Sequence, residues 1–551
     1  MMKTLGSAAL VLSLGVALSS QRAEACGCFA PPDPTVPIVQ AGERILFAVN
    51  NGVVTAHIQI QYAGDAKDFG WLLPLPAVPQ LKLGTEELFT QLINSTQPRY
   101  FVTRTFGDGC NSRFAFASPP SANSADTAGG GSEGGAGSPL VTQSSIGPYD
   151  YAVLRADSKD EMFNWLTSNR YFIPTGTDQT VGPYIRPGAY FLALKLKSGK
   201  SAGDIQPVVL EYQSDLPMIP IILTSVAANP NMGVQVWMLG SARAIPRNYN
   251  HVVLNDSQID WLNQAANYND VVIKAVSEAP EKHAFITEYS GSSDVMIDRL
   301  DYQGRFGNLT TLAGLSDPVD FVEYLFANGY AQNTGTPFGP VQQVLLPQVK
   351  NLVAQALPMP EPLKSVTDED SFYLALRYYL TTYRQSHPEA FKLWDPPFDA
   401  AALAAQLDEA VVKPTLNAGA IFRAHPTLTR LYTTLSPQDM TRDPVFSFNP
   451  SLAPVSRDHT ATLHTECTPF GTFTTFTTEQ GWVTHSSQFE PTGPGALRIE
   501  TLSEEGPAKI LTDNTSVIDP GRSGCGGCAS VEPMGLGLVA ALLALRRRRM
   551  S

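Results

Sequence analysis

The stretch that decides the fold is RILFAVNNGVVTAHIQIQY, residues 44–62. Its first six residues are mostly apolar and predict a strand with Ile45, Phe47 and Val49 on one face. Asn50-Asn51-Gly52 predicts a hairpin turn, because Asn and Gly tolerate the positive φ angles that such a turn requires. Residues 53–62 alternate again and predict the return strand, with its apolar side chains in a core. The opposite face of this strand is polar, so we expect the following side chains to face solvent: Thr55, His57, Gln59 and Gln61.

Outward from the hairpin, residues 26–255 read as a β-rich α+β domain, either sandwich-like or a mixed sheet with flanking helices. Alternating runs predict strands at 189–197, 207–212 and 233–239. Residues 85–94 predict a short helix, and Ser158 and Glu161 form a capping box that begins another. Residues 118–145 are rich in Ser, Gly, Ala and Pro, and they predict a flexible insertion that has no core of its own.

Residues 256–415 predict a mainly helical region. Asp317-Pro318 caps a helix that we expect to end near Asn328. Further helices are predicted at 257–268, 371–385 and 399–412, and we expect Pro414 to stop the last of them. Residues 416–514 return to β patterning, so the fold class we predict is α+β.

The N-terminus carries the pattern of a secretory signal peptide over residues 1–25. A basic Lys3 precedes an apolar stretch, and Ala23-Glu24-Ala25 fits the small-residue cleavage site of signal peptidase. Cleavage after Ala25 would leave Cys26 as the first mature residue. A lipoprotein signal is the alternative, but Ala23 and Glu24 fit its preference for Leu and a small residue poorly.

The C-terminus has three parts in fixed order: a linker at 515–532 with Cys525 and Cys528, an apolar run at 533–545, and Arg546–Arg549. A helix over the run would span ~20 Å of a ~30 Å hydrocarbon core. Four arginines favour the cytoplasmic side. We therefore expect residues 533–551 to form a hydrophobic helix that holds the chain in the membrane, at least transiently. A disordered basic tail is the alternative.

This tail resembles the MYXO-CTERM sorting signal of myxobacteria and their relatives, which combines a cysteine, a short hydrophobic helix and an arginine cluster. The resemblance implies that a sorting protease removes the helix and that the protein is retained at the cell surface. Cys525 and Cys528 are both candidates for the processing residue.

Composition limits the classes of partner. The chain has 551 residues, a net charge of −13 and no basic patch outside the tail, which argues against nucleic acid. Six cysteines in an exported chain suggest disulfides. Outside the tail, three pairings are open, and we expect the two cysteines closest in sequence to bond to the other two rather than to each other. Free buried thiols are the alternative. The candidates are Cys26, Cys28, Cys110 and Cys467.

A search for catalytic and metal motifs returns none in a suitable context. The sequence contains no H-E-x-x-H, and its G-x-S-x-G match at residues 130–134 lies in the Ser/Gly-rich insertion rather than at a strand-to-helix turn, so it is a linker. His459 and Cys467 lie on one face of a predicted strand but ~26 Å apart, so one segment cannot hold a metal there. Cys110 as a nucleophile is less favoured than a turn that leads into a disulfide. Cys525-x-x-Cys528 lacks the strand–helix context of a redox motif. We therefore predict no catalytic, metal or cofactor site.

Several short segments of the N-terminal half form a recognisable set: ACGCF at 25–29, QAGER at 40–44, FGWLLPLP at 69–76, IRPG at 185–188, SDLPMIP at 214–220 and RNY at 247–249. Through these segments, about residues 26–283 resemble a bacterial family known as domain of unknown function 2330. No activity is established for that family, so the resemblance implies only an exported bacterial protein with a β-rich domain.

Three functions remain open. The favoured one is a non-catalytic surface or envelope protein that binds another envelope protein or carbohydrate. The second is an extracytoplasmic hydrolase whose catalytic residues are dispersed along the chain, an arrangement that one sequence cannot reveal. The third is a sensor or scaffold of a secretion system.

Overall fold

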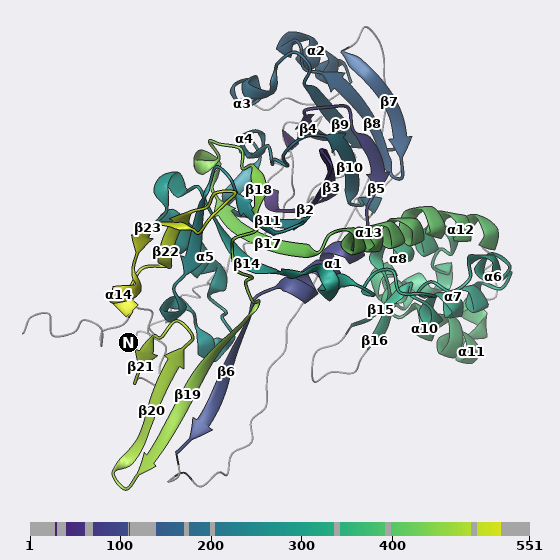
Figure 1. The fold of residues 1–551 in the computed structure, drawn as a ribbon. Helices are drawn as coiled ribbons and strands as arrows, with labels where there is room; N and C mark the ends of the chain where they lie inside the picture. Colours follow the sequence, from purple (N-terminus) through teal and green to yellow (C-terminus); the bar gives the residue numbers. More distant parts are fainter. Residues whose placement is uncertain are drawn as a thin grey trace, which may run out of the picture.

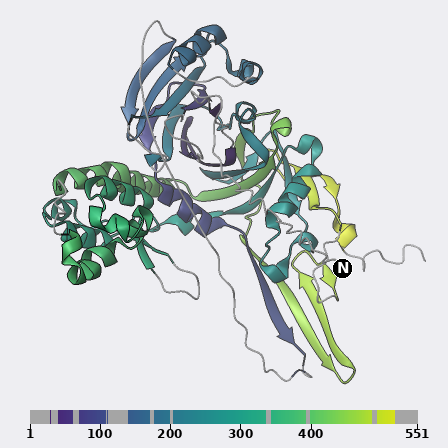
Figure 2. The same ribbon diagram turned by 180° about the vertical axis from the view of Figure 1, so that it is seen from behind.

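A computed structural model describes residues 28–29, 40–60, 70–107, 110, 139–169, 176–198, 204–334, 342–391, 398–485 and 493–518. The predicted signal peptide at 1–25, most of the predicted insertion at 118–145 and the tail at 533–551 lie outside these ranges. The predicted insertion is too long, because residues 140–145 belong to strand β7 (Leu140–Ile146), which pairs with β8 (Tyr149–Arg155). Figures 1 and 2 show a body of packed sheets, a helical module at one side and a long β arm that projects from the body. Of the helices within the described ranges, none has the length and apolar character needed to cross a membrane.

The predicted hairpin lies within a ten-stranded mixed sheet. Strands β11 and β2 run parallel, as do β13 and β14, and the other neighbours are antiparallel. The sheet takes strands from both β-rich regions of the sequence and one from the region between them. Its order is β23 (Lys509–Asp513), β22 (Ala496–Thr501), β13 (Asn250–Leu254), β14 (Ala284–Ser292), β17 (Thr427–Leu435), β11 (Ala228–Gly240), β2 (Gln40–Asn50), β3 (Val53–Gln59), β10 (Val208–Gln213) and β5 (Gln80–Leu83).

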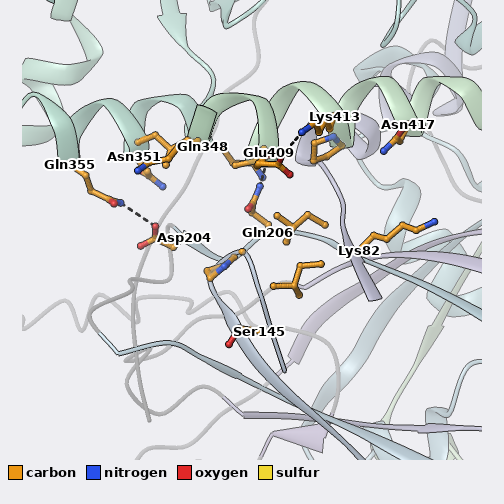
Figure 3. Close-up of a pocket in the computed structure, with 18 residues that line it drawn as sticks. Lys82, Ser145, Asp204, Gln206, Gln348, Asn351, Gln355, Glu409, Lys413 and Asn417 are labelled. Carbon is orange, nitrogen blue, oxygen red and sulfur yellow. Dashed lines mark hydrogen bonds and ion pairs between the residues drawn. The ribbon is translucent and has the colours of Figure 1, made fainter. Parts of the chain in front are cut away.

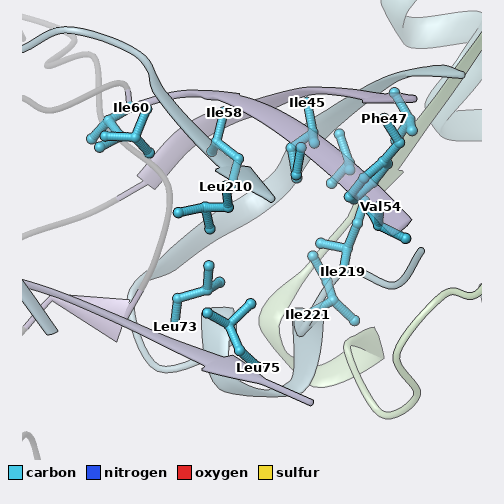
Figure 4. Packing of buried hydrophobic residues seen from close by; sticks show 14 of the residues in the cluster. Ile45, Phe47, Val54, Ile58, Ile60, Leu73, Leu75, Leu210, Ile219 and Ile221 are labelled. Atoms are coloured by element: carbon cyan, nitrogen blue, oxygen red, sulfur yellow. The ribbon is translucent and has the colours of Figure 1, made fainter. Parts of the chain in front are cut away.

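A five-stranded sheet packs face to face against the β2–β3–β10 end of the large sheet. Figure 4 shows Ile58 and Leu210 facing Leu73 and Leu75 across an apolar core. Helices α2 (Lys159–Ser168) and α3 (Thr177–Thr180) lie against the outer face (Figure 1). This sandwich with flanking helices confirms the α+β class. The order of the five strands is β1 (Cys28–Phe29), β4 (Gly70–Leu75), β9 (Tyr190–Leu196), β8 (Tyr149–Arg155) and β7 (Leu140–Ile146).

The prediction that His57 faces solvent is wrong. The second face of the large sheet is also covered. Helix α1 (Glu86–Thr96) packs on it, and side chains of the sheet such as Leu46 and Trp237 form a buried apolar cluster with those of the helix. His57 is consequently 4% exposed. Burial, and secondarily the charge of Lys82, lowers the pKa of His57 to about 4, so its imidazole is neutral. Alternation in a strand shows that its two faces differ, but it does not show that one of them is exposed to solvent.

The helical module has its own apolar core, which includes Phe321, Val353 and Leu403. The predicted cap is confirmed, since Asp317 Oδ1 accepts from Val319 N at 2.7 Å. Its elements are α6 (Leu309–Ala313), α7 (Pro318–Ala327), β15 (Ala331–Thr334), β16 (Gln342–Leu345), α8 (Pro347–Ala356), η7 (Glu361–Ser365), α9 (Glu369–Leu374), α10 (Leu376–Tyr378), the π-helix η8 (Tyr379–Tyr383), α11 (Arg384–Ser386), η9 (Pro388–Phe391), α12 (Ala400–Leu407), the π-helix η10 (Asp408–Val412) and α13 (Lys413–Ala424).

The prediction that Pro414 ends a helix is also wrong. The chain passes from α12 through the wide π turn η10 directly into α13, which runs to Ala424. A proline lacks the N–H that a continuous α-helix would use and crowds the preceding turn. Here it sits at the start of α13, directly after the π turn, so the helical path continues in the same direction.

The β arm is a four-stranded sheet in which β6 lies parallel to β19 although more than 350 residues separate them. It comprises β6 (Arg99–Phe106), β19 (Asp458–Thr468), β20 (Gly471–Thr478) and β21 (Val483–Thr484). The remaining elements are η1 (Gly182–Tyr184), α4 (Ile221–Thr224), β12 (Arg243–Pro246), η3 (Asp256–Gln258), η4 (Trp261–Asn263), α5 (Tyr268–Ser277), η5 (Pro280–Lys282), η6 (Ser293–Met296), η11 (Pro437–Asp439), β18 (Phe446–Asn449) and α14 (Thr515–Ile518).

Candidate functional site

A cavity of about 630 Å³ lies between the sandwich and the helical module (Figure 3). One wall comes from β5, the turn between β7 and β8, and residues 204–206. The other wall comes from α8 and from the continuous α12–η10–α13 helix. We call this cavity the amide groove, after the six amide side chains that line it: Gln206, Gln348, Asn351, Gln355, Gln406 and Asn417.

Helical spacing places the amides of α8 in one row. Gln348, Asn351 and Gln355 are three and four residues apart, so they share the face that lines the groove. Val349 and Val353, on another face of the same helix, are fully buried in the core of the module. The core therefore fixes the rotation of α8, and with it the row of amides.

A hydrogen bond across the groove takes the place of one that Pro414 cannot make. The carbonyl of Ala410 lies four residues before Pro414, which has no N–H to donate to it. Gln206 Nε2 donates to this carbonyl instead, at 2.8 Å. Gln206 is itself held by the fully buried Tyr149, whose hydroxyl donates to the Gln206 carbonyl at 2.5 Å and accepts from its N–H at 2.8 Å.

A second hydrogen bond joins the same two walls. Gln355 Nε2 on α8 donates to Asp204 Oδ1 at 3.2 Å, and Figure 3 shows this pair beside the Gln206 contact. Two separate ties, from α8 and from η10, therefore hold the sandwich against the helical module. They set the width of the groove.

The charges that line the groove are compensated within the protein. Lys82 pairs with Glu211 at 2.6 Å. Lys413 pairs with Asp408 at 2.9 Å and also with Glu409. The fourth charged side chain of the lining, Asp204, accepts a hydrogen bond from Gln355. The two cations and two carboxylates of the lining therefore balance, and a charged ligand would upset this balance, whereas an uncharged polar ligand would not.

The amides offer hydrogen-bonding capacity instead. Each amide side chain carries two donors and an acceptor, the same kinds of group that a peptide bond carries. Gln348 Nε2 is buried and has no hydrogen-bond partner among the described residues. Leu83, Ile146 and Leu352 add apolar surface between the amides. None of the described residues that line the groove is aromatic.

The cysteines that sequence analysis assigned to disulfides are only partly described. The structure joins Cys110 to Cys467, with Cα atoms 5.1 Å apart. This corrects the expected pairing, in which Cys26 and Cys28 would each have bonded to one of these two residues. The reason is that β6 runs beside β19 and brings the ends of both strands together. Cys28 lies in the short strand β1, opposite Leu72. The other predicted processing and disulfide residues lie outside the described ranges: Ala25, Cys26, Cys525 and Cys528.

The histidines of the β arm do not form a metal centre with its cysteine. His464 Nε2 lies 3.4 Å from Glu466 Oε1 on the exposed side of β19, while Cys467 is bonded to Cys110. His459 stacks on Tyr100, with ring centroids 4.7 Å apart. In the part of the chain that the structure describes, no three His, Cys, Asp or Glu side chains are grouped so that they could hold one metal ion.

None of the residues that line the amide groove was predicted from the sequence to belong to a site. One signal was present, the row of amides at helical spacing on α8. A second signal was Pro414 in the middle of a helical pattern, because such a proline can follow a π turn within a helix as well as end the helix. The partner of that turn, Gln206, is about 200 residues away in the sequence.

Fold and groove together define a mixed α+β protein in which a polar groove separates a β-sandwich from a helical module. The chain belongs to the family described as "Uncharacterized protein conserved in bacteria (DUF2330)", whose family model matches residues 21–313. Neither the curated proteins nor the solved structures contain a match to the chain. The matched range includes the sandwich wall of the amide groove, whereas α8 and the α12–η10–α13 helix lie beyond it.

Proposed function

We propose that this chain is an exported protein of the bacterial envelope that binds an uncharged, extended polypeptide segment of another envelope protein in the amide groove. The observation that carries the proposal is the lining of that groove, in which amides predominate and two cations are balanced by two carboxylates. The proposal is for a binding protein without catalysis.

An extended polypeptide fits this lining because its backbone presents alternating N–H and C=O groups that Asn and Gln side chains can match. Small apolar side chains of such a segment would contact Leu83, Ile146 and Leu352. A glycan strand is the other envelope polymer that is rich in polar groups. It is less favoured here because sugar rings gain much of their binding energy from stacking on aromatic faces.

Export and anchoring are supported by the sequence alone. The signal peptide at 1–25 implies cleavage by signal peptidase after Ala25. The tail at 533–551 implies insertion of the C-terminal helix in the membrane, followed by cutting at Cys525 or Cys528 by a sorting protease and retention at the cell surface.

Binding can be tested with an array of uncharged peptides of about ten residues and with soluble glycan fragments. We expect peptides to bind, and we expect the triple variant Asn351→Ala, Gln406→Ala, Asn417→Ala to weaken their binding at least tenfold, since each lost hydrogen bond contributes about 1 kcal/mol. The matched control is Gln143→Ala, Gln385→Ala, which removes exposed amides outside the groove. Binding of glycans only, or equal peptide binding by both variants, would contradict the proposal.

Export can be tested by mass spectrometry of the unreduced mature protein from membrane and surface fractions. We expect a mass that lacks residues 1–25 and the tail beyond Cys525 or Cys528. A mature protein that retains Arg546–Arg549 would rule out the sorting step.

A further inference from the structure

A second cavity, of about 370 Å³, lies over four adjacent strands of the large sheet: β14, β17, β11 and β2. Its volume is within the range of small-molecule sites. Three tyrosines from three different elements line it, and we call it the tyrosine pocket: Tyr100 of β6, Tyr268 of α5 and Tyr432 of β17.

The floor of the tyrosine pocket is a buried polar network. Arg430 Nε donates to Glu288 Oε2 at 2.5 Å, and a second guanidinium nitrogen donates to Gln235 Oε1 at 2.9 Å. Tyr268 donates its hydroxyl proton to Glu288 Oε1 at 2.6 Å. Arg430 and Glu288 are 7% and 3% exposed. Burying such a pair costs desolvation energy that an apolar core would not incur, so the network contributes little net stability.

The network is electrically balanced. The positive charge of Arg430 is offset by Glu288, and the carboxylate of Glu43, which also lines the pocket, offsets the charge of Arg44 at its edge. The pocket therefore offers fixed hydrogen-bonding groups and aromatic faces without a net charge for a ligand to neutralise. An anion or a cation would disturb the balance, whereas a neutral polar molecule would preserve it.

The rim is strained. Gln264 and Ala265 have φ angles of 54° and 60°, and both line the pocket. Two consecutive residues with side chains in the left-handed region are costly, by about 1–3 kcal/mol each. Such strain persists only where surrounding contacts enforce it, and it concentrates at ligand sites.

Tyr432 is positioned from two sides. Its hydroxyl donates to Asn269 Oδ1 at 2.9 Å on the exposed rim. On the opposite side Gly233 leaves room for the ring, because a Cβ there would lie 2.8 Å from the Tyr432 hydroxyl. Burial raises the pKa of Tyr432 to about 12, so the hydroxyl remains a donor at physiological pH.

From this arrangement we propose that the tyrosine pocket binds one ring of a neutral saccharide. The apolar C–H face of a sugar ring stacks on an aromatic face, while its hydroxyls need donors and acceptors, which Asn269 and the Tyr432 hydroxyl provide at the rim. The Gln235 amide already donates to the Leu431 carbonyl and accepts from Arg430, so it holds the floor in place. The pocket combines aromatic faces with hydrogen-bonding groups, in contrast to the amide groove, which has no aromatic residue among its described lining. The two sites take different ligands, and neither proposal depends on the other.

The test is calorimetric titration of the full mature chain with glucose, galactose, mannose and N-acetylglucosamine as probes. We expect at least one of these sugars to bind with a Kd of about 1 mM or tighter. Asn269→Ala and Tyr432→Phe should each weaken that sugar about tenfold, because each removes a hydrogen-bonding group of the pocket. Asn269 is exposed, so its substitution should leave the fold intact, which circular dichroism would check.

Two matched controls separate this site from the rest of the protein. Tyr302→Phe removes the hydroxyl of an exposed tyrosine elsewhere, and Asn417→Ala alters only the amide groove. Both should bind the sugar as the unsubstituted chain does. The proposal is overturned if none of the four sugars binds, or if the pocket variants and the controls bind equally well.

Discussion

The hydrogen bond from Gln206 to Ala410 offers a direct test of how the amide groove is held together. Gln206→Leu keeps a side chain of similar size but removes the donor, so the carbonyl of Ala410 loses its 2.8 Å partner. Ala410 is half-buried and lines the groove, so water can replace the lost donor in part and the cost is that of one hydrogen bond, about 1 kcal/mol. We expect local unfolding of η10 and the start of α13 to become easier by about 1 kcal/mol, which is a factor of about 5 in opening.

Native-state hydrogen exchange is the suitable assay, because a chain with several cores need not unfold in one transition. Amides of α13 should lose about fivefold protection in Gln206→Leu, whereas amides of β2 and β3 should not change. Pro414→Ala restores an N–H four residues after Ala410, so in that background the same substitution should cost less by about 0.5 kcal/mol or more.

The matched control is Gln355→Leu, which removes the other tie across the groove. Its acceptor, Asp204, is partly exposed and can bond to water, so the loss of protection should be smaller. If Gln206→Leu and Pro414→Ala prove additive to within about 0.3 kcal/mol, the two residues are not coupled and the reasoning about the missing N–H is refuted.

Three further outcomes are expected. Removing the Cys110–Cys467 disulfide by Cys→Ser should increase hydrogen exchange in β6 and β19 more than in the sandwich, since the bond ties the far ends of these strands; uniform exchange would contradict this. His57 has a native pKa of about 4 against an ordinary value of 6.5, so its contribution to the free energy of unfolding, about 3 kcal/mol, is present above pH 6.5 and is lost as the pH falls to 4. Thermal melts of His57→Gln should lack that part of the acid dependence. Glu288→Gln should destabilise by about 3–5 kcal/mol because it leaves the charge of Arg430 buried without its partner, and the double variant with Arg430→Met should recover most of this loss; equal melting temperatures for single and double variants would argue against a buried ion pair.

Local chemistry accounts for the elements that the sequence predicted well. The turn at Asn50-Asn51-Gly52, the cap at Asp317 and the capping serine Ser158 each involve residues within a few positions of one another. Their structure therefore depends little on the rest of the chain. The apolar sides of the two hairpin strands were likewise assigned correctly, because alternation is a property of one strand.

The helix predicted at 257–268 is wrong, because the chain there forms the short 3-10 turns η3 and η4 and the helix α5 begins only at Tyr268. The other errors concern information that is not local. His57 is buried because helices and strands from other regions cover the second face of its sheet. The pairing of Cys110 follows from a neighbour strand more than 350 residues away. Pro414 is accommodated because Gln206, about 200 residues earlier, supplies the missing donor. The amide groove and the tyrosine pocket are both formed in this way, and for that reason neither could be read from sequence periodicity.

The position of β17 has a consequence for the order of folding. This strand, residues 427–435, lies between β11 and β14 and pairs with both. Until it has been synthesised, each of these strands presents an unpaired edge to other chains, which is a route to aggregation. The large sheet can therefore close only late, after most of the chain is available. A fragment that ends where the family match ends, at residue 313, would keep both edges open, so the family region does not constitute a folding unit by itself.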